Sequence, residues 1–178
     1  MTHTIDSARS ALLERLRLEE APRYFEQALT HPSYANEHRA EQPSDNQRLE
    51  FLGDAVLDLC VSELLLERLP EADEGVLSRA YGSLVNGESL ARWARENGVG
   101  AALRVGRGAA ASGISERTNV LADAVEAIVA AVYLESGLDV HLKFRLSLQG
   151  GLMYVFPTTY SGYDLGGLGF RARVALNW

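Results

Sequence analysis

The chain has a single cysteine and no long apolar run, and each absence excludes a class of protein. Because Cys60 is alone among the 178 residues, no disulfide can form within the chain. The first residues lack the basic and then apolar pattern of a signal peptide, and no apolar stretch approaches the roughly 18 residues that span a bilayer. We therefore expect a reduced, cytoplasmic protein without a membrane partner, with Cys60 in its core.

Positive charge is also scarce. The formal net charge is −7 at pH 7, which argues against broad, non-specific affinity for nucleic acid. Lys143 is the only lysine, so any contacts to phosphate groups depend on arginine, whose planar guanidinium favours paired hydrogen bonds over a diffuse basic patch. The balance is uneven, since residues 141–178 hold four basic residues and one acidic residue.

Through most of the chain, apolar residues recur every three or four positions, which is typical of amphipathic helices. No convincing strand alternation occurs before Leu138, so the pattern predicts an all-α domain. Polar or Gly/Ala-rich composition predicts loops over residues 35–46 and 106–113. Helices are predicted over residues 7–18, 23–30, 47–68, 75–85, 89–97 (capped by Ser89 and followed by Gly98) and 116–136.

The composition changes at about residue 140, where glycine becomes frequent and charges become rare. Strand fragments are conceivable at residues 152–156 and 170–176. A unit of 38 residues without a metal ion or a disulfide would be marginal as an independent domain. We therefore expect a domain over residues 1–139 and a short irregular C-terminal tail over residues 140–178.

Two pairs of carboxylates lie on apolar helical stretches: Glu50 with Asp54, and Asp123 with Glu126. Residues three or four apart share a helix face, so two such faces turned toward each other would form a cluster of four carboxylates. None of the residues one turn away is basic. A hard cation such as Mg²⁺, which takes oxygen ligands, would compensate the charge. Solvated helix faces or distant arginine partners are the alternatives.

Residues 46–57, Asn-Gln-Arg-Leu-Glu-Phe-Leu-Gly-Asp-Ala-Val-Leu, resemble the signature helix of the ribonuclease III family. Three further segments resemble this family in the same order along the chain. They are Ala28-Leu-Thr-His-Pro-Ser-Tyr-Ala-Asn-Glu before the signature helix, Asp73-Glu-Gly-Val-Leu-Ser-Arg with Ser83-Leu-Val after it, and Asn119-Val-Leu-Ala-Asp-Ala-Val-Glu-Ala. The resemblance covers about residues 8–139, and four ordered motifs are more specific than one short pattern.

The resemblance implies a dimeric, all-helical endonuclease that cuts both strands of double-stranded RNA and leaves 5′-phosphate and 3′-hydroxyl ends. It implies Mg²⁺ as the cofactor, with Mn²⁺ as a substitute, and ribosomal RNA precursors and structured messages as substrates. Matched residue by residue, Glu50, Asp54, Asp123 and Glu126 are the metal ligands, with Asp54 and Glu126 the catalytic residues. Mg²⁺ on such a cluster activates water and stabilises a leaving oxygen.

The resemblance also assigns residues around the quartet. Phe51 matches an aromatic side chain that plugs a socket on the partner subunit, although an ordinary core phenylalanine is the alternative. Gln47 and Glu74 match accessory positions near the metal or the RNA, although an exposed helix-start carboxylate such as Glu74 is more often a favourable partner of the helix dipole. Asn119, one turn before Asp123, is a further accessory candidate that could orient metal-bound water or a carboxylate, and a helix-start cap is the equal alternative.

Two more polar residues near these motifs receive structural interpretations. His31 is better explained as a cap or hydrogen-bond partner of the turn at Pro32 than as a general base. Asp58 continues the stripe of Glu50 and Asp54 along the same helix, and we give it a solvated or supporting role.

The chain departs from the family pattern in two places. Gln47 stands where many relatives have glutamate, which removes one charge beside the quartet. Bacterial relatives also continue into a double-stranded-RNA-binding domain with a lysine-rich helix start, and residues 141–178 show no such pattern. We interpret them as a truncated or frameshifted remnant of that domain, and we expect RNA affinity to be weakened and strongly dependent on salt.

Two other functions compete with this interpretation. A catalytically impaired, RNA-binding or structural relative would typically lack the acidic quartet, and here all four acids are present. A metal phosphohydrolase of the His-Asp type would need an adjacent His-Asp pair, which none of the four histidines provides.

Overall fold

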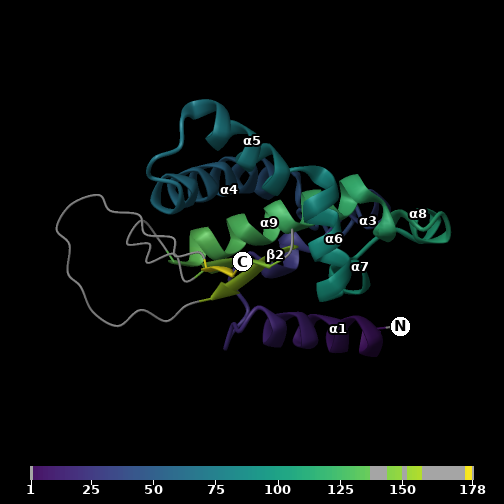
Figure 1. Ribbon diagram of the computed structural model, residues 1–178. Helices are drawn as coiled ribbons and strands as arrows, with labels where there is room; N and C mark the ends of the chain where they lie inside the picture. Colours follow the sequence, from purple (N-terminus) through teal and green to yellow (C-terminus); the bar gives the residue numbers. More distant parts are fainter. Residues whose placement is uncertain (1, 137–143, 150–151, 158–174, 178) are drawn as a thin grey trace.

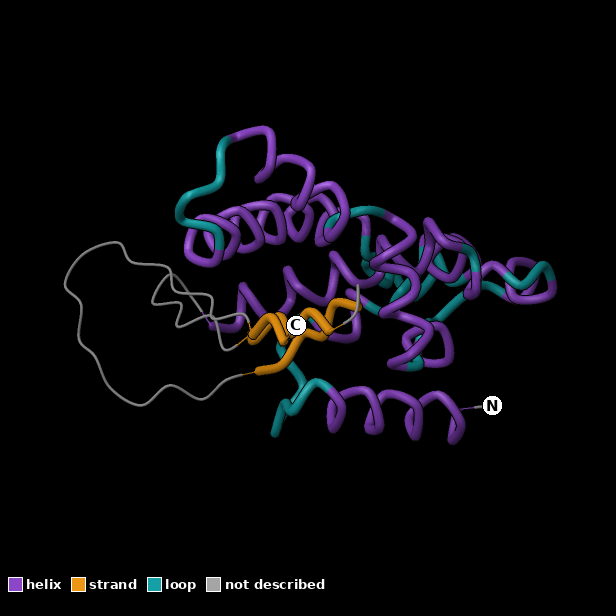
Figure 2. The backbone as a smooth tube through the Cα atoms, in the orientation of Figure 1, coloured by secondary structure: helices purple, strands orange, loops and turns teal. Residues whose placement is uncertain are grey.

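The computed structural model describes residues 2–136, 144–149, 152–157 and 175–177, and helices dominate it (Figures 1 and 2). The helices are α1 (Thr2–Arg15), α2 (Phe25–Ala28), α3 (Pro32–Glu37), α4 (Gln47–Arg68), α5 (Glu74–Leu84), α6 (Gly87–Asn97), α7 (Val99–Ala102), α8 (Arg107–Ala111), the 3-10 helix η1 (Ile114–Glu116) and α9 (Thr118–Ser136). Within residues 2–136 the β pairing is limited to an isolated bridge between Thr30 and Arg104. The predicted all-α domain is confirmed.

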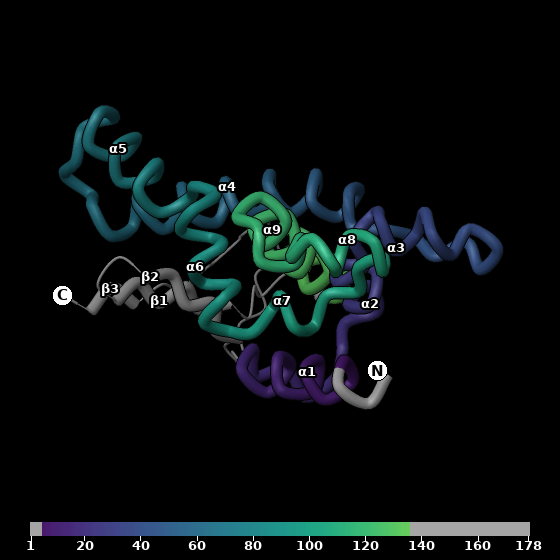
Figure 3. The backbone as a smooth tube through the Cα atoms, turned by 90° about the vertical axis from the view of Figure 1, so that its right-hand side faces the viewer, coloured from purple at the N-terminus to yellow at the C-terminus, as the bar shows by residue number. Residues whose placement is uncertain are grey.

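Helix α9 runs through the middle of the molecule, with α4 on one side and α1 on the other in both views (Figures 1 and 3). Its sequence is apolar nearly all the way round, and such a helix is expected to be buried. Most of its residues from Val120 to Val132 are indeed buried, Ala124, Ala127, Ala130 and Ala131 completely. The small alanines let neighbouring helices approach on several sides, and the remaining core comes mainly from α4 and α6.

Helices α4 and α9 touch at Gly53. A Cβ atom built on Gly53 would lie 1.8 Å from the carbonyl oxygen of Glu126, which is far inside any allowed contact. Glycine inside a helix costs about 1 kcal/mol relative to alanine. A glycine is nevertheless required at this position, because any side chain would prevent the backbones of α4 and α9 from meeting.

Helix α4 begins and ends at the predicted residues, 47 and 68, but the cap of α6 differs from the prediction. The Asn86 side chain accepts a hydrogen bond from the Ser89 backbone N–H, so Asn86 rather than Ser89 is the N-cap. Gly98 ends the helix in the left-handed conformation at φ 73°, as predicted.

Both predicted loops contain helix, and the reasons lie in capping. Pro32 does not end a helix but occupies the first turn of α3, with His31 as its N-cap. The Glu37 carboxylate accepts hydrogen bonds from the backbone N–H groups of Arg107 and Gly108 and so caps α8 from a distant part of the chain. A long-range cap of this kind leaves no local sequence signal.

The described parts of the tail are strands, where the sequence analysis predicts an irregular segment. They are β1 (Phe144–Gln149), β2 (Leu152–Pro157) and β3 (Ala175–Asn177), in the order β2-β1-β3. Strands β1 and β2 are antiparallel, with residue 144 opposite 157 and 149 opposite 152, while β1 and β3 are parallel. The fragment predicted at residues 152–156 corresponds to β2, and residues 170–174 lie outside the described residues.

In the part of the chain that the structure describes, no helix combines the length and the apolar character needed to cross a bilayer.

The contact at Gly53 leads to a prediction about stability. We expect Gly53→Ala to destabilise the fold by about 1–3 kcal/mol, because the new methyl group must push α4 away from α9. Gly82→Ala is the matched control. Gly82 lies inside α5 with no other atom near its missing Cβ, so the same change should stabilise the fold by about 0.5–1 kcal/mol. Urea unfolding measures both, and equal effects would contradict the proposed backbone contact.

Candidate metal centre

Three carboxylates meet where α4 faces α9. Glu50 lies in the first turn of α4, and Asp123 and Glu126 lie one turn apart on α9. Each offers one oxygen atom, and these atoms all lie within 4.8 Å of one another. All three side chains are half-buried. The acidic faces of α4 and α9 therefore meet in the structure through Glu50, Asp123 and Glu126.

Asp54, the fourth predicted ligand, lies at the edge of this group. It is exposed and does not belong to the set within 4.8 Å. Its charge nevertheless acts on Glu126, where it is the largest contribution after burial to a raised pKa. Because Asp54 follows Gly53 directly, the backbone contact with Glu126 keeps it beside the cluster.

The proximity of the carboxylates is electrostatically unfavourable. Burial, followed by the charge of Asp54, raises the pKa of Glu126 to about 8. Burial is also the first cause that raises the pKa values of Glu50 and Asp123. The charge of His31 opposes the rise at Asp123. Like charges in a partly desolvated site disfavour ionisation in this way.

Arginine does not neutralise the cluster in the described part of the chain. The ion pairs there join Arg9 and Arg104 to Glu26, and Arg95 to Glu88. None includes a cluster carboxylate. Of the two alternatives that the sequence left open, distant arginine partners are thus not found among the described residues. Full solvation is excluded for Glu50, Asp123 and Glu126, which are half-buried.

The donor set fits a divalent cation. Three carboxylate oxygens at mutual distances within 4.8 Å, with a fourth carboxylate beside them, match the hard oxygen ligands that Mg²⁺ and Mn²⁺ take. A bound cation would also offset the repulsion that raises the pKa of Glu126.

His31 is the N-cap of α3, and its charge acts on Asp123 of the cluster. Its Nδ1 accepts a hydrogen bond from the Ser33 backbone N–H at 3.1 Å, which caps α3. The predicted capping role is confirmed. Burial lowers the pKa of His31, while the charges of Asp123 and Asp45 raise it. The imidazole is therefore a neighbour of the cluster that is held in place by α3.

The three predicted accessory residues stand at or near the starts of three helices. Gln47 is the exposed first residue of α4, and its backbone N–H donates to the Asp45 side chain at 3.2 Å. Glu74 opens α5 and accepts a hydrogen bond from the Ser78 hydroxyl at 2.7 Å. Asn119 is exposed in the first turn of α9 and is not at its cap position, since the helix already begins at residue 118. Their proximity to RNA stays a prediction.

Phe51 is the most exposed large apolar side chain in the described chain, at 82%. The alternative of an ordinary core phenylalanine is therefore wrong. Two further exposed leucines, Leu59 and Leu66, lie on the same helix.

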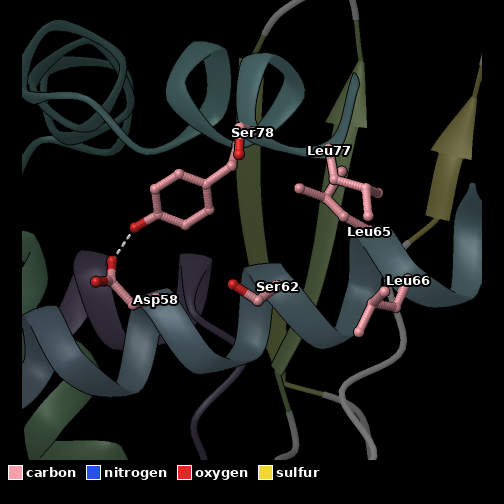
Figure 4. Close-up of a pocket in the computed structure, with 7 residues that line it drawn as sticks. Asp58, Ser62, Leu65, Leu66, Leu77 and Ser78 are labelled. Atoms are coloured by element: carbon pink, nitrogen blue, oxygen red, sulfur yellow. Dashed lines mark hydrogen bonds between the residues drawn. The ribbon is translucent and has the colours of Figure 1, made fainter. Parts of the chain in front are cut away.

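Sequence reasoning missed Tyr81. Its hydroxyl donates a hydrogen bond to the Asp58 carboxylate, which joins α5 to α4 beside a cavity of about 420 Å³ (Figure 4). The cavity is lined by Asp58, Ser62, Leu65, Leu66, Leu77, Ser78 and Tyr81. Residues 58 and 81 are far apart in sequence, so no spacing could pair them. Gly53 did carry a signal, because a glycine inside a strong helix indicates a close approach.

The comparisons with known proteins agree with this geometry. The sequence model of the family described as Ribonuclease-III-like matches residues 22–148. Among the relatives, Ribonuclease 3 of Mycolicibacterium paratuberculosis is 42% identical over 161 residues, which cover 89% of this chain and 67% of the relative. Ribonuclease 3 of Heliobacterium modesticaldum is 46% identical over 138 residues, which cover 78% and 59%. Ribonuclease 3 of Geobacter metallireducens is 51% identical over 116 residues, which cover 65% and 47%.

A solved structure of the nuclease domain of ribonuclease III from Campylobacter jejuni superposes with a TM-score of 0.64 at 37% identity. The match covers 71% of this chain and 85% of that domain. The Campylobacter jejuni domain shows structural flexibility in a region that is involved in dimer formation.

The chain spans only part of these curated relatives, from 67% of the first to 47% of the third. The match to the solved nuclease domain is more complete, at 85% of its length. The family model alone matches well over half of the chain. On these grounds the chain belongs to the ribonuclease-III-like family.

Proposed function

We propose that the protein is a metal-dependent endoribonuclease that hydrolyses phosphodiester bonds of double-stranded RNA and leaves 5′-phosphate and 3′-hydroxyl ends. The observation that carries the proposal is the group of Glu50, Asp123 and Glu126 within 4.8 Å, without an arginine ion pair among the described residues. Membership of the ribonuclease-III-like family supports the choice of reaction and substrate.

Mg²⁺ is the ion that we propose, with Mn²⁺ as a substitute, and Glu50, Asp54, Asp123 and Glu126 would hold it. The ion would supply a means of activating water and of stabilising the leaving oxygen. The chain itself supplies the negative charge and the rigid spacing. The contact between Gly53 and Glu126 holds the two helices that carry these ligands.

Glu126 and Asp54 are the proposed catalytic residues. With a pKa near 8, the Glu126 carboxyl holds a proton at neutral pH until an ion is bound, and ion binding releases that proton. Asp54 is exposed, so it is accessible to a phosphate group of the substrate from the solvent side.

The proposed substrate is recognised by shape. A-form RNA displays phosphates and 2′-hydroxyl groups across a wide minor groove, while its bases are poorly accessible. Gln47, Glu74 and Asn119, which stand at helix starts, are the proposed accessory contacts. The net charge of −7 disfavours RNA binding, and the arginines that contact phosphates would release counterions, so we expect binding to be weak and to fall steeply with salt. Ribosomal RNA precursors and structured messages in the cytoplasm are the proposed targets.

The proposal also includes a homodimer. Phe51 is 82% exposed on α4, and the exposed Leu59 and Leu66 add apolar surface on the same helix, as a partner-binding surface would. In the proposed dimer, Phe51 of each subunit packs against the other subunit.

The first test is the loss of cleavage on Glu126→Gln. We expect the purified protein to cut long double-stranded RNA at low salt only when Mg²⁺ or Mn²⁺ is present. Glu126→Gln should lower the rate by about a hundredfold or more, as expected for a group that acts in the transition state. Glu96→Gln, an exposed glutamate on α6, is the control and should leave the rate unchanged.

Cleavage that is unaffected by a chelator or by Glu126→Gln would refute the proposed centre. A folded dimer that binds double-stranded RNA without cutting it would favour a binding-only relative instead.

The raised pKa of Glu126 predicts a dependence of stability on pH. Charging this carboxyl costs more in the folded chain, where the pKa is about 8, than in the unfolded chain, where it is 4.5. The cost is absent below pH 4.5 and grows until the pH passes about 8. With a chelator present, Glu126→Gln should therefore raise the melting temperature at about pH 8.5 by about 2–4 °C, or about 1 kcal/mol after solvent screening.

At about pH 5 the same substitution should change the melting temperature little, because the wild-type carboxyl is then protonated in the folded chain. Scanning calorimetry at the two pH values measures the difference. A gain of equal size at both would show that the pKa of Glu126 is not raised.

The exposed Phe51 predicts the oligomeric state. Phe51→Ala should raise the dissociation constant of the dimer about tenfold or more, as is usual for a central aromatic anchor, without loss of the fold. Sedimentation equilibrium measures the constant. Leu134→Ala removes another exposed apolar side chain, on α9, and should leave the constant unchanged. A monomeric wild-type protein would contradict the prediction.

A further inference from the structure

We infer that Tyr81 is a positioning residue for the proposed metal centre. It holds the Asp58 carboxylate in a hydrogen bond and so keeps this fifth carboxylate from serving as an ion ligand. The inference rests on the proposed function and adds to it a residue on α5 that is neither an ion ligand nor a proposed RNA contact.

Asp58 would otherwise belong to the same acidic stripe as two proposed ligands. Glu50, Asp54 and Asp58 follow one another at intervals of four residues on α4, so their side chains leave one face of the helix. Asp58 is half-buried, and its charge is among those that raise the pKa of Glu126. It is therefore within electrostatic reach of the centre.

Tyr81 reaches Asp58 from the facing helix. The Tyr81 hydroxyl on α5 donates a hydrogen bond to the Asp58 carboxylate on α4, and a dashed line at Asp58 marks this bond in Figure 4. The ring is half-buried. Burial, and then the hydrogen bond to Asp58, raise the pKa of the Tyr81 hydroxyl, so it stays protonated and acts only as a donor.

A hydrogen bond to a carboxylate constrains where its oxygen atoms point. Bonds to charged groups are roughly twice as strong as bonds between neutral groups. The donor at Tyr81 thus directs Asp58 toward α5 and the adjoining cavity. Without that donor, the Asp58 side chain is free to rotate toward Asp54 and to offer additional negative charge to a cation.

The inference predicts a specific change in ion binding. Tyr81→Phe removes only the hydroxyl, and it should tighten the binding of Mn²⁺ to the RNA-free protein about two- to fivefold, the range expected for coupling between partly exposed charges. The rate of RNA cleavage at saturating Mn²⁺ should fall, because ion positions that include Asp58 compete with the productive one. Titration followed by electron paramagnetic resonance of free Mn²⁺ measures the affinity without RNA.

Asp58→Asn tests whether Tyr81 acts through this carboxylate. In the double variant Tyr81→Phe with Asp58→Asn, the affinity for Mn²⁺ and the cleavage rate should return to those of Asp58→Asn alone. If Tyr81 merely fills space between the helices, its effect will persist when Asp58→Asn is also present, which overturns the inference. Tyr133→Phe, a half-buried tyrosine on α9, is the matched control and should change neither quantity.

Glu126→Gln separates this inference from the proposed function. If Glu126→Gln leaves Mn²⁺ binding intact, the centre itself is refuted, and the inference about Tyr81 with it. If Glu126→Gln abolishes binding while Tyr81→Phe binds Mn²⁺ as the wild type does, only the role of Tyr81 is refuted.

Discussion

At Gly53 the backbone of α4 approaches α9 so closely that a Cβ atom would lie 1.8 Å from the Glu126 carbonyl oxygen. The neighbours of these two residues are the proposed ion ligands, Glu50 and Asp54 on one helix and Asp123 on the other. Helices that cross with side chains between them typically lie about 8–10 Å apart, and here the missing side chain lets them come closer. The spacing of the carboxylates is thus set by a glycine that carries no chemistry itself.

This geometry works against the stability of the ion-free protein. The pKa of Glu126 rises to about 8 because the site is partly desolvated and crowded with acidic groups. The apolar residues of α9 around the cluster provide the burial that compensates, since nearly all of them belong to the core. A charged, partly buried site inside a well-packed helix pair is a common arrangement where function costs stability.

Around the centre, neighbouring elements limit what the carboxylates can do. His31 caps α3 while the charges of Asp123 and Asp45 act on its imidazole, and Glu37 fixes α8 by capping it. On the other side, Tyr81 ties Asp58 to α5. These contacts come from segments that are distant in sequence. Among the described residues, none of these contacts brings an arginine into an ion pair with the quartet.

The local features of the chain follow from the sequence alone. Helix α4 has the predicted bounds because its apolar spacing, a polar start and Pro70 all act within a few residues. That Glu50 and Asp54 share one helix face, as do Asp123 and Glu126, was also predictable from spacings of four and three. The meeting of the two faces was implied only by the family resemblance. Four features could not be predicted from the sequence and appear only in the tertiary structure. They are the distance between the carboxylate pairs, the exposure of Phe51, the capping of α8 by Glu37 and the hydrogen bond from Tyr81 to Asp58. Each of these depends on a contact between segments far apart in the chain, and helical periodicity carries no information about such contacts.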